Sequence, residues 1–313
     1  MSVWFEEDEL EEDMGVGHDH AAHAGARHRG RLAIAFAMIA VFFAVELIAG
    51  IASRSLALIS DAGHMAADVV ALGAALVATR IATRPDRTGR RSFGSYRVEV
   101  FAAGLTVLIM LGVAVYVVIE AIGRIGAPTE LATGTMLIVG ALGLAINLVS
   151  MVLLRAGSQE SINVKGAYYE VVADAAGSVG VIAAGVLVMI TGSGIWDTVI
   201  ALAIGAFVAV RAAILGRQVL HVLGQHAPKD LDLAEIERDL RALDGVLDIH
   251  DLHVWTLTSG MNVATAHLLL SAEGQRQAVL VAAQTALQRD HGIEHATLQI
   301  ETAPTKQCHE VAW

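Results

Sequence analysis

Long apolar runs alternate with short polar connections over most of the chain. About 20 helical residues cross the roughly 30 Å hydrocarbon layer of a bilayer. Six runs reach this length and predict transmembrane helices near residues 31–53, 56–80, 97–123, 131–155, 165–190 and 195–219. Arg211 and Arg217 interrupt the last run, so we expect its final turns to emerge from the membrane. The pattern predicts an α-helical, multi-pass membrane protein.

Shorter periods begin after about Pro228. Helical periodicity and strand alternation predict the order helix, strand, strand, helix, strand over residues 231–243, 246–257, 261–271, 275–289 and 296–301. This αββαβ order is typical of a small α+β domain. A domain of this size is near the lower limit for a self-sufficient core, which favours a homodimer.

The composition agrees with a membrane protein. Hydrophobic residues make up 55% of the chain and charged residues 17%, with a mean hydropathy of +0.58. The net charge of −11 comes largely from the acidic N-terminus and from the region beyond about residue 228. Basic patches with interleaved aromatic residues are absent from the sequence, so nucleic acid is not expected as a partner. The single cysteine, Cys308, excludes an internal disulfide and suits a reducing cytosol.

Arginine and lysine residues predict the orientation. They gather before the first run, between the second and third runs and between the fourth and fifth, whereas the opposite connections carry little beyond Arg54 and Arg124. Cytoplasmic loops are enriched in these residues. We therefore expect both termini in the cytoplasm, and the bacterial inner (cell) membrane as the location.

Two of the predicted membrane helices carry paired metal ligands. His64 and Asp68 lie in the second helix, and Glu170 and Asp174 lie in the fifth. An i, i+4 spacing puts each pair on one helix face, about 6 Å apart along the axis. Because the two helices run antiparallel, His64 should lie level with Asp174, and Asp68 level with Glu170. Ionisable groups inside a bilayer mark ion pathways, although pairing that only holds the helices together is the alternative.

This quartet offers one imidazole and three carboxylates. Zinc accepts such ligands, cobalt and cadmium compete closely, and manganese or iron(II) is not excluded.

Three other polar residues in the membrane runs have weaker interpretations. Asp61 could form an entry shell on the outer side, Asn147 could hydrogen-bond a ligand carboxylate or another helix, and Glu46 could carry protons or form a structural pair.

The C-terminal region carries a second candidate metal site. His250, His267 and Glu301, with His295 as a further ligand, fall on neighbouring predicted strands. Strand alternation places His250 on the face of Leu252 and Val254, opposite His253. Histidines at a dimer interface are the alternative.

Near the N-terminus, a third group could bind transition metals loosely or belong to a disordered polar tail; it consists of His18, His20 and His23.

These observations divide the chain into four parts. They are an acidic and histidine-rich cytoplasmic tail (1–30), a six-helix transmembrane domain (31–222), a cytoplasmic α+β dimerisation and metal-binding domain (223–302) and a C-terminal tail (303–313).

Five stretches resemble the cation diffusion facilitator family, and they lie at residues 55–65, 91–97, 163–168, 173–180 and 250–255. The resemblance covers about residues 28–302. It implies six helices, a metallochaperone-like cytoplasmic domain, a homodimer, and export of divalent metal in exchange for protons. The family's site positions fall on His64, Asp68, Glu170 and Asp174.

Glu170 departs from the zinc-selective pattern of that family, in which histidine is usual. Glutamate at this position is similar to the bacterial cobalt–zinc–cadmium resistance branch, and it favours a broader range of metals. We therefore expect proton-coupled efflux of zinc, with Co²⁺ or Cd²⁺ as alternative substrates and with a possible regulatory role for Zn²⁺ in the cytoplasmic domain. The alternatives are a membrane metal sensor and a metal-dependent intramembrane hydrolase. We do not expect an enzyme, because the sequence lacks an H-E-x-x-H motif and a nucleophile elbow.

Overall fold

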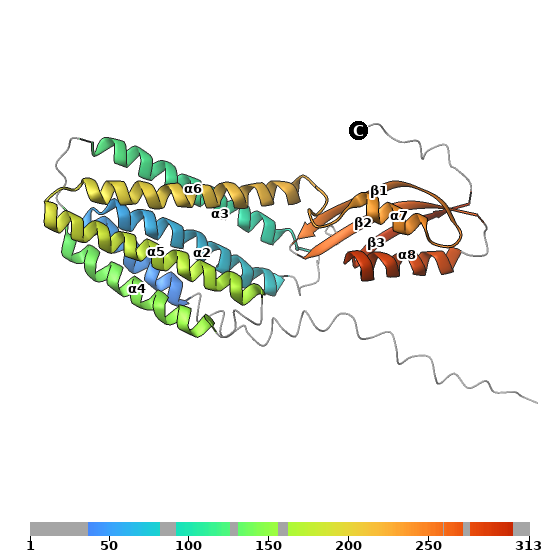
Figure 1. The fold of residues 1–313 in the computed structure, drawn as a ribbon, viewed down its shortest axis with the longest axis horizontal. Coiled ribbons are helices and arrows are strands. Elements are labelled where there is room, and N and C mark those ends of the chain that lie inside the picture. The colour runs from blue at the N-terminus through green and yellow to red at the C-terminus, as the bar shows by residue number, and fades with distance from the viewer. Residues whose placement is uncertain are drawn as a thin grey trace, which may run out of the picture. The chain divides into compact units, whose positions relative to one another are not determined.

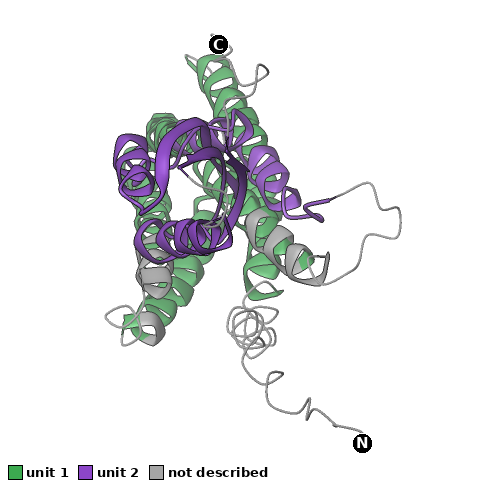
Figure 2. Cartoon of the chain, turned by 90° about the vertical axis from the view of Figure 1, so that its right-hand side faces the viewer, with its two compact units in different colours: residues 1–85, 108–212 green, residues 86–107, 213–313 purple. Residues whose placement is uncertain are grey.

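The computed structural model describes residues 37–81, 92–125, 131–155, 162–258, 260–271 and 276–302; within the helices, some side chains between 71 and 81, at 153 and 154, and from 162 to 170 are not described. The chain divides into two compact units (Figure 2). Unit 1 comprises residues 1–85 and 108–212, and unit 2 comprises residues 86–107 and 213–313.

Up to residue 223 the described residues form six helices (Figure 1). They are Ala37–Ser53, α2 (Leu56–Ile81), α3 (Val98–Gly123), α4 (Thr133–Arg155), α5 (Ile162–Thr191) and α6 (Ile195–Leu223). Four of them, α3 to α6, contain segments long and apolar enough to cross a membrane. Ala37–Ser53 is a shorter apolar helix, and α2 carries most of the ionisable residues of interest. The predicted membrane domain is confirmed.

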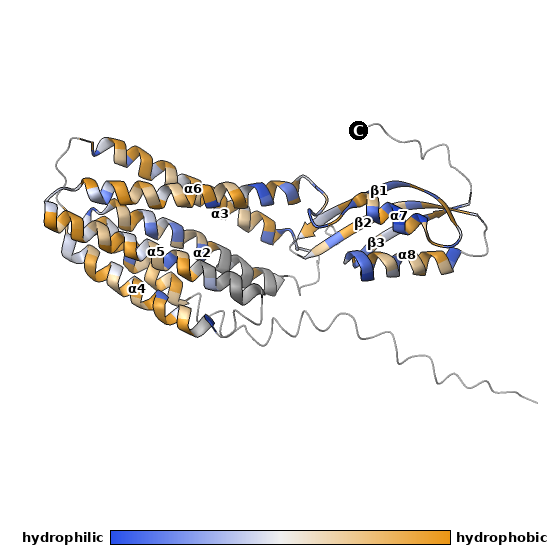
Figure 3. Ribbon diagram, in the orientation of Figure 1, coloured by the Kyte–Doolittle hydropathy of each residue, from blue (hydrophilic) through white to orange (hydrophobic). Residues whose placement is uncertain are grey.

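Hydrophobic residues predominate along these helices (Figure 3), and many of their large apolar side chains are exposed. Ile48, Leu108, Ile119, Val152 and Ile190 are each more than half exposed. Such surfaces are costly in water but suit the hydrocarbon of a lipid bilayer. The helices therefore present to lipid the faces that a soluble bundle would bury.

The buried interior of unit 1 is tightly packed. A cluster that includes Leu56, Val117, Met136 and Val181 joins α2 to α3, α4 and α5. A Cβ atom at Gly140 of α4 would lie 3.0 Å from the Ile182 side chain of α5. Small residues of this kind allow membrane helices to approach closely.

One buried carboxylate fixes the N-terminal end of α2. Asp197, in the first turn of α6, accepts hydrogen bonds from Ser55 Oγ at 2.6 Å, from the Leu56 amide at 2.7 Å and from the Ala57 amide at 3.1 Å. The first amide groups of a helix lack partners within the helix, so a carboxylate there stabilises its start. Asp197 thereby holds α2, the helix that carries His64, against α6.

Unit 2 contains the predicted αββαβ domain. Its elements are α7 (Leu233–Arg241), β1 (Val246–Thr258), β2 (Met261–Leu270), α8 (Arg276–His291) and β3 (His295–Glu301). The sheet order is β1-β2-β3, with β1 and β2 antiparallel and β2 and β3 parallel. Ile236 of α7, Leu268 of β2 and Leu287 of α8 share one buried core, so both helices cover the same face of the sheet.

Candidate metal centres

The first centre lies between α2 and α5 in unit 1. His64 Nε2 lies 3.1 Å from Asp174 Oδ1 and 3.9 Å from Asp68 Oδ2. Each of these residues offers a ligand atom within 4.8 Å of the other two. The expected level pairing of His64 with Asp174 is therefore observed, since regular helices carry the i, i+4 spacing over this distance. The side chain of Glu170, the fourth predicted ligand, lies outside the described residues.

Burial makes this centre suited to an ion. His64 is 3% exposed, whereas the Asp68 and Asp174 side chains are 31% and 24% exposed. Asp174 Oδ1 lacks a hydrogen-bond donor among the described residues and faces the His64 nitrogen. A buried carboxylate oxygen needs a proton or a cation. A metal ion bound between His64 Nε2 and Asp174 Oδ1 would satisfy both atoms.

An arginine from a third helix reaches the same centre. Arg211 Nη1 of α6 lies 2.9 Å from His64 Nε2, and its guanidinium carbon lies 5.9 Å from the centre of the Phe207 ring. The sequence interpretation treated Arg211 only as a sign that α6 leaves the membrane. Local sequence patterns do not mark this contact, because it depends on the packing of the buried Val208 and Ala212 of α6 against Ala67 of α2.

Two further carboxyl groups lie behind His64. Glu46 is 1% exposed and Asp61 5% exposed, and Glu46 Oε2 lacks a hydrogen-bond partner among the described residues. Asp61 packs against Gly177 of α5, where a Cβ atom would collide with its carboxylate. Asp61 is thus enclosed between helices.

Asn147 has a structural contact. Its Nδ2 donates to Ser178 Oγ at 3.5 Å, which joins α4 to α5. Of the two roles considered for Asn147, the helix–helix contact is the one that the structure contains.

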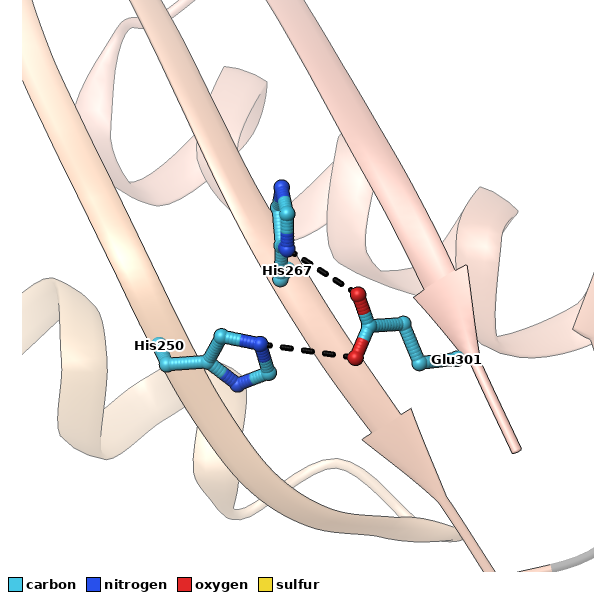
Figure 4. A group of neighbouring side chains, drawn as sticks. All are labelled: His250, His267 and Glu301. Carbon is cyan, nitrogen blue, oxygen red and sulfur yellow. Dashed lines mark ion pairs between the residues drawn. The ribbon is translucent and has the colours of Figure 1, made fainter. Parts of the chain in front are cut away.

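The second centre lies on the sheet of unit 2 (Figure 4). Glu301 Oε2 lies 3.4 Å from His250 Nε2, and Glu301 Oε1 lies 3.0 Å from His267 Nδ1. The three residues come from β3, β1 and β2, and His250 pairs directly with His267 in the strand register. Glu301 is 5% exposed although it lies on the face away from α7 and α8. Two imidazoles and a carboxylate form a common zinc ligand set.

The face assignment of His250 was wrong. The register shifts between His250 and His253, and Asp251 has a φ of 52°. This β-bulge adds a residue and reverses the alternation of side chains. Ile249 and Val254 consequently both enter the core, and His250 lies on the opposite face, with His267.

Other predicted ligands lie elsewhere. His295 pairs with Val263 at the far end of β3 from Glu301, and its ring packs edge-on against Phe93 at a centroid distance of 5.5 Å. The cluster of His250, His267 and Glu301 therefore forms without His295. The N-terminal group of His18, His20 and His23 lies outside the described residues.

Comparisons with known families match both regions of the chain. The profile described as the cation efflux transmembrane domain matches residues 32–223, and that of the cation efflux protein, cytoplasmic domain, matches residues 228–303. A solved structure titled as the metal-bound C-terminal domain of the CzcD transporter from Cupriavidus metallidurans is 39% identical and covers 23% of this chain and 99% of its own, with a TM-score of 0.22.

Full-length relatives agree with these matches. The metal cation efflux system protein CzcD of Cupriavidus metallidurans is 44% identical over 94% of this chain and 92% of its own length. The cadmium, cobalt and zinc/H(+)-K(+) antiporter of Bacillus velezensis is 35% identical over 92% and 93%. The zinc transporter ZitB of Escherichia coli is 35% identical over 95% and 94%.

The relatives are transporters, and they give no support to the sensor or the hydrolase. The profiles together span the membrane helices and the αββαβ domain, which are the regions that hold the two metal centres. The chain therefore belongs to the cation efflux family, the cation diffusion facilitators, and is a membrane transporter rather than an enzyme.

Proposed function

We propose that this protein expels divalent transition-metal cations from the cytoplasm in exchange for protons, with zinc as a substrate and cobalt and cadmium as further substrates. The observation that carries the proposal is the convergence of His64, Asp68 and Asp174 from two membrane helices. Glu170 completes the proposed ligand set from the α5 turn that precedes Asp174. The alternating exposure of these ligands to the two sides of the membrane would move the ion.

The ligand chemistry supports this range of metals. An imidazole nitrogen with carboxylate oxygens suits zinc, cobalt and cadmium, and geometry rather than raw affinity separates them. The relatives named as a cadmium, cobalt and zinc antiporter and as a zinc transporter carry out the same class of reaction.

Proton exchange follows from the same ligands. Carboxylates and imidazoles must be deprotonated to bind a metal, so binding releases protons. Glu46, a further buried carboxyl group in the same unit, would serve as an additional proton carrier. An inward proton gradient would reload the ligands after the metal leaves and would drive export.

The remaining assignments complete the proposal. We place both termini in the cytoplasm of a bacterium, the helices in the lipid bilayer of the cell membrane, and two copies of the chain in a homodimer joined through the cytoplasmic domain. His250, His267 and Glu301 would hold a regulatory Zn²⁺ in that domain, because they form a compact ligand group that is separate in sequence from the transport ligands.

Metal uptake into proteoliposomes tests the function. Zinc, cobalt, cadmium and manganese would be added outside vesicles that contain the purified protein, with a proton gradient directed out of the vesicles. Asp174→Asn should reduce uptake of the transported metals to the level of empty vesicles, since it removes a ligand charge. Asp290→Asn is the matched control: the hydrogen bond with Arg289 lowers the pKa of this exposed carboxyl, so it too loses one negative charge. Undiminished transport by the Asp174 variant would refute the proposed site.

A further inference from the structure

Arg211 places a permanent positive charge at the proposed transport site. Its Nη1 lies 2.9 Å from His64 Nε2, the nitrogen that also lies 3.1 Å from Asp174 Oδ1. Guanidinium groups remain charged in proteins and only donate hydrogen bonds. In the neutral tautomer that carries its proton on Nδ1, His64 accepts this bond through the Nε2 lone pair, which is the lone pair that a metal at this position would use.

We propose that Arg211 is a tethered competitor of the transported metal: its guanidinium occupies the His64 nitrogen between transport events, and a divalent ion must displace it to bind. The proposal rests on the function proposed above. Arg211 would then be a residue that determines affinity and selectivity, in addition to the ligands themselves.

The packing of α6 supports a side chain that is aimed at this site yet able to withdraw. Val208 and Ala212 are fully buried and hold this helix face against α2. Phe207, one turn before Arg211, lies with its ring centre 6.3 Å from the His64 ring and 5.9 Å from the guanidinium carbon. An aromatic face attracts a guanidinium, so Phe207 contacts the arginine in this position and would still attract it after it left the His64 nitrogen.

The charge of an ion determines how readily it can replace Arg211 at the site. A monovalent cation that replaced Arg211 would leave the net charge of the site unchanged and would gain little. A divalent ion adds a further positive charge beside Asp68 and Asp174, and it repels the guanidinium at short range in surroundings of low polarity. Displacement of the arginine therefore favours divalent over monovalent ions, whereas a guanidinium that remains nearby lowers the affinity for the divalent ion.

Zinc binding to the full-length protein in nanodiscs tests the proposal. The measurement would use His250→Ala/His267→Ala protein, so that the cytoplasmic centre does not contribute, and Asp174→Asn would identify the signal of the membrane site. Arg211→Gln should bind zinc about tenfold more tightly or better, because it removes the competing charge. Its maximal transport rate should fall as zinc release slows. Arg217→Gln, an exposed position on the same helix, should match the parent.

Arg211→Lys provides a second test if the glutamine variant fails to fold. The shorter ammonium side chain withdraws from His64 but keeps its charge, so its zinc affinity should lie between those of the parent and Arg211→Gln. Parental or weaker zinc binding in both variants would overturn the role of Arg211 and leave the transport site intact. If the parent protein showed no zinc binding that depends on Asp174, the proposed transport function itself would fail.

Discussion

The two candidate metal centres offer similar ligands on different supports. In the membrane centre, the ligands come from α2 and α5, and Arg211 joins them from α6. In the cytoplasmic centre, three hydrogen-bonded strands hold His250, His267 and Glu301 in a fixed register. Packed helices can tilt or slide as bodies, whereas a strand can shift only by breaking its ladder of hydrogen bonds. The membrane centre is thus suited to release its ion, and the cytoplasmic centre to retain one.

Charge reinforces this difference. The membrane centre combines carboxylates with a guanidinium cation, which opposes a bound divalent ion. In the cytoplasmic centre, the neutral Gln299 donates a hydrogen bond to Glu301 Oε1 at 2.7 Å beside the histidines. A transporter needs one site from which the ion leaves in every cycle, and only a regulatory site benefits from long occupancy.

The largest expected effect is the loss of one bound metal. His250→Ala/His267→Ala/Glu301→Gln removes the whole ligand group of the cytoplasmic centre, so the zinc content should fall by one ion per chain. Equilibrium dialysis against a zinc buffer would measure it. The membrane site of this variant should still bind zinc and lose it in Asp174→Asn. Loss of both ions in the triple variant would mean that the two centres are not separate.

A smaller effect is expected from Glu170→His. The change replaces a titrating carboxylate with a neutral nitrogen donor whose reference pKa is about 6.5. Because nitrogen donors suit zinc better than manganese, the preference for zinc over manganese should rise several-fold, on the order of 1 kcal/mol. Uptake should also depend on pH over a higher range, since the imidazole still binds protons where a free carboxyl does not. Competition transport assays at several pH values would measure both; an unchanged ranking and profile would show that Glu170 is not a ligand.

The sequence predicted the elements that depend on local periodicity. The i, i+4 spacing placed His64 opposite Asp174, and alternation and turn residues located the three strands within a residue or two. The predicted face of His250 was wrong because the bulge at Asp251 breaks the regular alternation of side chains that the prediction assumed. The helix α6 continues to Leu223, past the predicted segment 195–219, because a helix does not have to end where its apolar run ends.

The contact between Arg211 and His64 could not be predicted from local sequence patterns. It depends on which face of α6 packs against α2, and that is decided by non-local contacts of Val208 and Ala212 with Ala67.

The central claim is that the exported metal binds to His64, Asp68, Glu170 and Asp174. Zinc K-edge absorption of the His250→Ala/His267→Ala/Glu301→Gln protein, loaded with one zinc per chain, tests it most directly. The account predicts a four-coordinate ion with one imidazole nitrogen and oxygen ligands at about 2.0–2.2 Å, and loss of this signal in Asp174→Asn. A shell with two or more imidazoles, or one that Asp174→Asn leaves unchanged, would contradict it.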